Sequence, residues 1–352
     1  MATRSRPSSR SRQPSPISLR RFKTGEQLEE GPVLGSDGTA IHANRIVLIT
    51  GAASGIGLAA AKKFARHGLH VCLADRDSEP LKKAESLVAE IAGADNVLAV
   101  VTDVSKLDQV QRLRDEVMAK FGEVNVLLHA AAIGKASDGS IGTAFENLSA
   151  WQQVLDVNLG GTINVIQTFT PAMCSQENPG AIILTGSKQG ITNPPGNTAY
   201  NVSKAAVKTL AENLAHELRN RGGFVTAHLF VPGWTWTGMT GSKTGAIKPD
   251  GAWTPEETVR YMFDKVRQGE FYIICPDNET PEALDHIRIK WAAGDILEGR
   301  PALSRWHPEW KYQFEEYVRE NMQDVQDHRE AGEAASIGAS GLDTNPKSTI
   351  GN

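Results

Sequence analysis

The chain has 352 residues, of which 40% are hydrophobic and 22% charged, and its formal net charge is −4. This composition provides enough apolar surface for a sizeable core, and it lacks the excess of basic residues that nucleic-acid binding requires. No run approaches the roughly eighteen apolar residues that span a bilayer, and Cys72, Cys174 and Cys275 show no spacing typical of disulfide frameworks or zinc sites. We therefore expect a cytoplasmic protein that binds neither nucleic acid nor membranes.

Residues 1–44 are predicted to be a disordered tail. Ser, Pro and Arg dominate its first half, no acidic residue precedes Glu26, and apolar periodicity is absent. An Arg- and Ser-rich start is also typical of mitochondrial transit peptides, so targeting to that organelle is the less favoured alternative. This segment is not expected to join the core.

Strand-like and helix-like segments alternate from Arg45 onward, which is the pattern of a parallel sheet with helices on both faces. The predicted fold is a doubly wound, Rossmann-type α/β domain over residues 45–280 with a seven-stranded parallel sheet. Short aliphatic runs predict strands at 45–50, 71–74, 97–101, 126–130, 181–184, 225–231 and 271–275. Helical spacing predicts helices at 56–67, 79–91, 107–121, 151–174 and 198–221.

The strand pattern stops after Cys275. Residues 281–330 are expected to form a helical C-terminal extension, and residues 331–352, rich in Gly, Ser and Ala, a second disordered tail. The extension carries several aromatic residues: Trp291, Trp306, Trp310, Tyr312 and Phe314.

A glycine-rich turn joins the first predicted strand to the first predicted helix. Glycines at this position let backbone N–H groups approach a pyrophosphate, and the helix N-terminus favours its negative charge. The residues expected to hold it are Gly51, Ser54, Gly55, Ile56 and Gly57.

Asp75 ends the second predicted strand, at the distance along the chain where a carboxylate accepts hydrogen bonds from adenosine ribose hydroxyls. Its charge would repel a 2′-phosphate, which favours NAD as the cofactor. The neighbouring Arg76 could neutralise part of that repulsion, so NADP stays open.

Tyr200 and Lys204 lie four residues apart at the start of a predicted helix, which places the phenol and the ammonium on one face. A nearby positive charge favours the phenolate, so the pair could exchange a proton with a substrate hydroxyl. Ser187 lies just beyond the predicted strand at 181–184, and its hydroxyl could hold the substrate oxygen.

Together with Asn158, these residues resemble the short-chain dehydrogenase/reductase family over about residues 45–275. The resemblance implies that Tyr200 is the acid/base, that Lys204 lowers its pKa and binds the nicotinamide ribose, and that Ser187 orients the substrate oxygen. It also implies that Asn158 kinks its helix and supports a proton relay through water to the lysine. The further cofactor contacts that it implies are Asp103, Val104, Ala130, Pro232, Gly233, Thr235 and Thr237.

One motif departs from the family pattern. The family's Asn-Asn-Ala-Gly after the fourth strand reads His129-Ala130-Ala131-Ala132, and Thr185-Gly186-Ser187 replaces the commoner double serine. We interpret His129 as a structural substitute for the first asparagine, with its ring as the hydrogen-bonding group. The nine histidines lack metal-ligand spacing, so no metal is expected.

The sequence thus predicts an NAD(P)-dependent oxidoreductase that interconverts a secondary alcohol and a ketone or aldehyde. The segment from Trp234 to Trp253 resembles a substrate lid and suggests an apolar or aromatic substrate, although its tryptophans would fit packing against the C-terminal extension equally well. The resemblance also implies a homodimer or homotetramer. Two alternatives are a non-catalytic NAD(H)-binding sensor or scaffold and a sugar-nucleotide epimerase or dehydratase, whose glycine spacing differs from that of Gly51, Gly55 and Gly57.

Overall fold

The computed structural model describes residues 40–242 and 245–340. Most of the two predicted tails, residues 1–39 and 341–352, lies outside the described residues. Ala40 is buried in the core, and the backbone N–H of Asn44 donates to the carbonyl of Gly68 at 2.8 Å. The prediction of a tail through residue 44 was therefore wrong at its inner end, because residues 40–44 pack on the domain.

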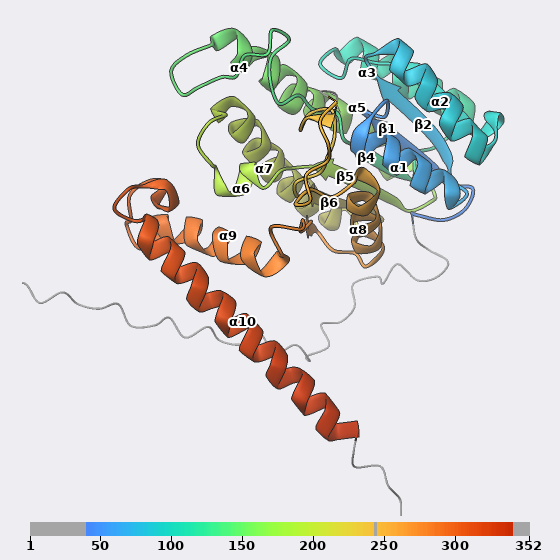
Figure 1. Ribbon diagram of the computed structural model, residues 1–352. Coiled ribbons are helices and arrows are strands. Elements are labelled where there is room, and N and C mark those ends of the chain that lie inside the picture. The colour runs from blue at the N-terminus through green and yellow to red at the C-terminus, as the bar shows by residue number, and fades with distance from the viewer. Residues whose placement is uncertain (1–39, 243–244, 341–352) are drawn as a thin grey trace, which may run out of the picture. The chain divides into compact units, whose positions relative to one another are not determined.

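Seven parallel strands form one sheet in the order β3-β2-β1-β4-β5-β6-β7, which confirms the predicted doubly wound fold (Figure 1). The strands are β1 Ile46–Thr50, β2 His70–Asp75, β3 Val97–Val101, β4 Val126–His129, β5 Gly180–Thr185, β6 Val225–Val231 and β7 Tyr272–Ile274. The chain leaves β3 at one edge and returns beside β1, so the strand order reverses between β1 and β4. In such sheets a crevice opens at the carboxyl ends of the strands at this point.

Helices cover both faces of the sheet, because each buries one apolar stripe against it. Side chains of α1, α2 and α8 share a core with one face, and side chains of α3, α5 and α7 share a core with the other. These helices are α1 Gly55–Arg66, α2 Ser78–Ala92, α3 Leu107–Phe121, α5 Gly161–Ser175, α7 Thr198–Asn220 and α8 Pro255–Arg267.

The predicted helix at 151–174 is interrupted. α4 runs over Leu148–Leu155, a π-helical turn follows over Asp156–Gly160, and α5 continues the chain. Asn158 lies inside that wider turn, where its side chain hydrogen bonds both to the N–H and to the carbonyl of Ile133. Such turns are frequent at functional sites.

Two helices were not predicted. α8 begins with a capping box, in which Thr254 and Glu257 each accept a hydrogen bond from the other's backbone N–H, and Pro255 occupies its first turn. The short helix α6, Gln189–Thr192, follows β5 directly. Both follow strands at the edge of the sheet where the crevice opens.

The C-terminal extension is helical, as predicted, and consists of α9 (Glu282–Leu297), the 3₁₀ turn Ser304–Trp306 and α10 (Lys311–Ser340). Trp291 lies at the centre of this extension, and its side chain is buried. The centroid of its ring is 5.4 Å from that of Phe314 and 5.0 Å from that of Tyr317, and the Arg300 guanidinium packs over the ring at 3.8 Å. α10 passes residue 330, where the second tail was expected to begin, because Glu and Ala continue to favour helix there. Within the described residues, no helix is long and apolar enough to cross a membrane.

Candidate active site

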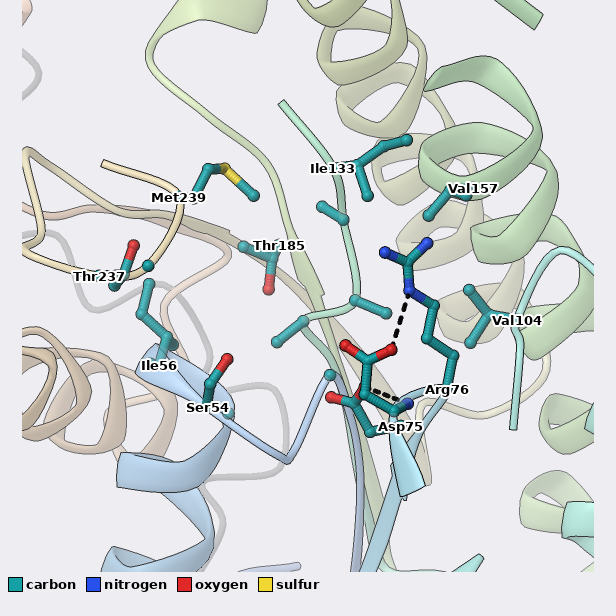
Figure 2. A pocket seen from close by; sticks show the side chains of 18 of the residues that line it. Ser54, Ile56, Asp75, Arg76, Val104, Ile133, Val157, Thr185, Thr237 and Met239 are labelled. Atoms are coloured by element: carbon teal, nitrogen blue, oxygen red, sulfur yellow. Dashed lines mark hydrogen bonds and ion pairs between the residues drawn. The ribbon is translucent and has the colours of Figure 1, made fainter. Parts of the chain in front are cut away.

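A pocket opens at the carboxyl ends of the strands on either side of the β1–β4 reversal (Figure 2). Segments that follow six neighbouring strands, β1 to β6, reach it, which is why residues from distant parts of the sequence meet there. Its walls contain most of the predicted cofactor-binding residues: Gly51, Ser54, Gly55, Ile56, Gly57, Asp75, Asp103, Val104, Ala130, Tyr200, Lys204, Pro232 and Thr237.

Two glycines of the turn, Gly51 and Gly57, leave no room for a side chain. A Cβ on Gly57 would stand 2.1 Å from the carbonyl oxygen of Gly51, so the first turn of α1 can lie directly against the loop. Gly51 has a φ of +68°, and a Cβ there would lie 2.8 Å from the backbone nitrogen of Ala131. The loop therefore presents backbone N–H groups and the N-terminus of α1 to the pocket, which suits a pyrophosphate.

Asp75 is held by the loop itself. One carboxylate oxygen accepts a hydrogen bond from the Ala53 N–H at 3.0 Å, and the other accepts one from the Asp77 N–H at 3.2 Å. The Arg76 side chain extends over the same end of the pocket (Figure 2), and its guanidinium lies 3.6 Å from the Asp77 carboxylate. The carboxylate is thus fixed, whereas the guanidinium is exposed and paired with an acidic neighbour.

Tyr200 and Lys204 line the pocket, and Ser187, which is not among the lining residues, lies next to Tyr200. Asn197 caps α7 by accepting a hydrogen bond from the Tyr200 N–H, so Tyr200 and Lys204 lie on successive turns of one helix face. Lys204 Nζ donates to the Thr185 carbonyl at 2.8 Å and lies 5.8 Å from the centre of the Tyr200 ring. The Ser187 side chain is within hydrogen-bonding reach of the Tyr200 phenol.

The protonation states of this cluster follow from its burial. Desolvation raises the pKa of Tyr200 above its ordinary value, and the hydrogen bond with Ser187 only partly opposes that shift. Burial lowers the pKa of Lys204 to about 8. The phenol is therefore protonated at neutral pH, and forming the phenolate requires positive charge beyond that of Lys204.

Asn158 does not line the pocket but connects two of its walls. Its amide bonds to both backbone groups of Ile133, and its Nδ2 donates to Ser203 Oγ at 3.0 Å. Ser203 Oγ in turn donates to the Tyr200 carbonyl at 2.7 Å. Asn158 thereby fixes α7 relative to the segment after β4.

His129 is buried and shares a hydrogen bond of 2.8 Å between its Nδ1 and Thr50 Oγ1. Burial and the Lys204 charge lower the pKa of His129 to about 3, so the ring is neutral. β1 and β4 pair in register at these two residues. The ring therefore ties β4 to the residue that precedes the glycine-rich turn, which is the structural role expected from the sequence.

Two predicted cofactor contacts lie outside the pocket wall. Gly233 packs against the segment after β7, where a Cβ would lie 2.6 Å from the Pro276 carbonyl oxygen, and Thr235 hydrogen bonds to Thr258 of α8. The pocket also contains residues that the sequence analysis did not select: Asp77, Thr102, Ala131, Ala132, Ile133, Val157, Thr185, Gly186, Gly238 and Met239. Their position at strand ends beside β1 and β4 is the signal that could have identified many of them.

The residues fit a nicotinamide dinucleotide. Gly51 and Gly57 admit no Cβ, so the loop lies close against the N-terminus of α1 and the segment after β4. Asp75 offers a fixed acceptor, and Thr185 Oγ1 is buried at the pocket wall with no hydrogen-bond partner among the described residues. Within the part of the chain that the structure describes, no group of three or more His, Cys, Asp or Glu side chains is arranged to hold a metal ion.

Comparison with known proteins places residues 45–247 in the family described as short chain dehydrogenase. A 3-oxoacyl-(acyl-carrier-protein) reductase of Staphylococcus epidermidis is 36% identical over 206 residues, which are 58% of this chain and 81% of that protein. The corresponding reductase of Thermotoga maritima is 36% identical over 197 residues, 56% of this chain and 76% of that protein.

Solved structures show the same likeness. A short chain dehydrogenase/reductase from Burkholderia phymatum in complex with NAD superposes with a TM-score of 0.65 at 29% identity, covering 73% of this chain and 96% of that one. A short chain dehydrogenase from Shigella flexneri complexed with NADP gives a TM-score of 0.57 at 26% identity, covering 66% of this chain and 97% of that one.

Proposed function

The chain belongs to the short-chain dehydrogenase/reductase family of nicotinamide-dependent oxidoreductases acting on CH–OH groups, and we propose that it interconverts a secondary alcohol and a ketone or aldehyde with Tyr200 as the acid/base. The observation that carries the proposal is that Tyr200 and Lys204 line the same pocket as the glycine-rich turn, with Ser187 beside the Tyr200 phenol.

The side chains have distinct roles. Tyr200 Oη removes the hydroxyl proton in oxidation and returns it to the carbonyl oxygen in reduction, while Ser187 Oγ holds that oxygen. Lys204 supplies a positive charge close to the Tyr200 ring, and because it lines the pocket its ammonium could also bind the nicotinamide ribose. Asn158 keeps α7 in register with Ile133.

The cofactor supplies the hydride acceptor or donor when it is bound. Gly51, Gly55 and Gly57 would hold its pyrophosphate and Asp75 its adenosine ribose. An oxidised nicotinamide carries a positive charge, which would favour the phenolate that burial disfavours in Tyr200. In this proposal, the oxidation state of a bound cofactor would influence how readily Tyr200 takes the substrate proton.

The substrate is proposed to be an apolar or aromatic carbonyl compound. Met239 lines the pocket and is 52% exposed, and Trp234, in the same segment after β6, is 36% exposed. Two other tryptophans of this segment pack locally: Trp253 on Tyr261 of α8, and Trp236 against Gly241. The likeness to reductases of 3-oxoacyl groups also supports a ketone on an apolar chain.

The proposal is tested by incubating the protein with reduced or oxidised cofactor and a panel of aliphatic and aromatic ketones and alcohols. For at least one apolar ketone and its corresponding alcohol, we expect the absorbance at 340 nm to fall with ketone and reduced cofactor and to rise with alcohol and oxidised cofactor. A protein that binds NAD(H) but turns over no member of the panel would instead be a sensor or scaffold.

NAD is the proposed cofactor, because the fixed Asp75 carboxylate would repel a 2′-phosphate. Replacing Asp75 with Ala removes that repulsion and leaves Arg76 to attract the phosphate, so the ratio of the NADP Kd to the NAD Kd should fall by about tenfold or more. Loss of the hydrogen bond to Ala53 should weaken the binding of both cofactors. The ratio of the two Kd values, measured by titration calorimetry, is therefore the quantity to compare.

The matched control for that substitution is Asp95→Ala, which changes an exposed carboxylate on the turn before β3. Its Kd ratio should equal that of the wild type. If Asp75→Ala left the ratio unchanged as well, Asp75 would not determine cofactor choice.

We also propose a homodimer or homotetramer in the cytoplasm. The exposed apolar side chains Ile163 of α5 and Val202 of α7 support pairing through these two long helices. Light scattering during gel filtration measures the oligomeric state.

A further inference from the structure

The segments after β5, β6 and β7 meet at a buried ion cluster beside the substrate side of the pocket. Lys188 Nζ lies 3.2 Å from Asp277 Oδ2 and 2.6 Å from Asp285 Oδ2, and both carboxylates are only 5% exposed. Lys188 directly follows Ser187, Asp277 follows β7, and Asp285 lies in the first turn of α9. One ammonium group thus connects a predicted active-site serine to the C-terminal extension.

Asp277 ties two of these segments together. The same Oδ2 that faces Lys188 accepts a hydrogen bond from the Trp234 N–H at 2.9 Å, while Oδ1 accepts one from the Thr280 N–H at 2.9 Å. Gly233 approaches the segment so closely that a Cβ there would lie 2.9 Å from Asp277 Oδ2. The position of Trp234 therefore depends on this carboxylate.

Lys188 is connected through α6 to α7, the helix that contains Tyr200 and Lys204. Its carbonyl accepts hydrogen bonds from the N–H groups of Ile191 and Thr192, so it anchors α6. α6 contacts α9 on one side. On the other side it packs against α7, since a Cβ on Gly190 would lie 2.5 Å from the carbonyl carbon of Lys204. A shift of Lys188 would move Ser187 and α6 relative to Tyr200 and Lys204.

Further cations lie near the two carboxylates. Arg288, one turn after Asp285 on α9, donates to Thr280 Oγ1 at 3.2 Å. Burial raises the pKa of Asp285, while Lys188 and Arg288 oppose that shift. Arg305 also interacts electrostatically with Asp285. Removing one carboxylate would leave Lys188 without one of its two partners, and losing a partner destabilises a buried charge far more than one at the surface.

We propose that Lys188, clamped between Asp277 and Asp285, is a positioning residue that makes helix α9 part of the substrate side of the active site. It does so by fixing Ser187 and the Trp234 segment relative to Tyr200. This inference rests on the proposed function. Asp277 and Asp285 lie beyond residue 247, where the match to the family model ends, and Asp285 belongs to the C-terminal extension.

The kinetic test uses Asp285→Asn, Ser187→Ala and the double variant. Asp285→Asn should lower kcat/KM at least tenfold and leave the cofactor Kd within about twofold of the wild-type value, because the glycine-lined end of the pocket is remote from the cluster. If Asp285 acts through Ser187, adding Asp285→Asn to the Ser187→Ala variant should lower kcat/KM by less than about threefold. Equal costs in both backgrounds would overturn the proposal.

A matched control is Glu282→Gln, in the same first turn of α9, where the side chain is 53% exposed and 3.9 Å from His286. It should retain the wild-type kcat/KM. A loss equal to that of Asp285→Asn would show that any change in this turn disturbs α9, and would remove the specific role of the cluster.

A second measurement does not depend on turnover. Hydrogen exchange followed by mass spectrometry should show peptides covering residues 187–192 and 233–237 exchanging at least fivefold faster in Asp285→Asn, while the sheet peptides stay protected. Unchanged exchange in both peptides would overturn the positioning role. If the wild type turned over no substrate, the proposed function would fail, and exchange alone would still decide whether the cluster holds these segments.

Discussion

Replacing Tyr200 with Phe is expected to lower kcat by about a thousandfold and to leave the cofactor Kd within about threefold of its wild-type value. The substitution removes only the phenolic oxygen, so the pocket wall is retained while the proton donor and acceptor nearest to Ser187 is lost. Initial rates at 340 nm give kcat, and quenching of the cofactor fluorescence gives Kd.

Tyr272→Phe is the matched control for this change. Tyr272 lies in β7, and its hydroxyl donates to Glu212 at 2.5 Å on the protein surface, so its loss should leave kcat unchanged. A Tyr200→Phe variant that kept more than about a tenth of the wild-type rate would show that another group handles the proton.

Replacing Lys204 with Met should also remove most of the activity, because a charge close to the Tyr200 ring and a group that could bind the nicotinamide ribose are lost together. We expect a fall in kcat/KM of about a hundredfold or more, with contributions from weaker cofactor binding and from a phenol that ionises less readily. Lys208→Met, one turn later on α7, removes a lysine paired with Glu212 instead and should retain activity. Activity in Lys204→Met close to the wild-type level would remove Lys204 from the catalytic cluster.

The same substitution has a second, pH-dependent effect on stability. Burial lowers the pKa of Lys204 from 10.5 to about 8, so the folded protein loses this proton before the unfolded chain does. Between these two pH values the unfolded state binds more protons, and the free energy of unfolding of the wild type should rise with pH by up to about 3 kcal/mol relative to Lys204→Met.

Denaturant titrations of the cofactor-free proteins at pH 7.5 and pH 10 measure that difference. Below about pH 8 both states of the wild type hold the proton, so the full cost of burying the ammonium is present there. A stability difference between wild type and Lys204→Met that does not change with pH would mean that the buried ammonium is not penalised in this way.

The sheet was predictable because buried parallel strands form short, nearly continuous aliphatic runs. Val47, Leu48 and Ile49 in β1 are fully buried on both faces, and this pattern recurs in every central strand. The glycine-rich turn and Asp75 also predicted where the crevice lies, because both follow the carboxyl ends of strands. Family membership followed from the joint spacing of Ser187, Tyr200 and Lys204, and the match over residues 45–247 confirms it.

The break in the helix at Asn158 was expected only from the family resemblance, which implies a kink there. The segment itself has continuous helical spacing, and the π turn is explained by hydrogen bonds to Ile133, which lies 25 residues away in sequence. α8 was missed although Thr254-Pro255-Glu256-Glu257 is a typical helix start. The lid assignment ended at Trp253, and the helix begins immediately after it.

The cluster around Lys188 could not be predicted from sequence. Lys188 and Asp277 are 89 residues apart, and neither belongs to a local motif. Only the order β5-β6-β7 brings the ends of these strands together and lets α9 approach α6. The pKa of Tyr200 was also beyond sequence reasoning: Lys204 was expected to favour the phenolate, whereas desolvation raises the pKa in the structure.

In the proposed reaction, a hydride passes between C4 of the nicotinamide and the carbinol carbon while Tyr200 transfers the proton. Reduced cofactor carrying deuterium at both C4 positions, incubated with a ketone identified by the panel, reports on both steps. We expect one deuterium on the carbinol carbon of the wild-type product, measured by mass spectrometry, and transfer about a thousandfold slower in Tyr200→Phe. Carbinol hydrogen taken from solvent, or equal transfer rates in the two proteins, would contradict it.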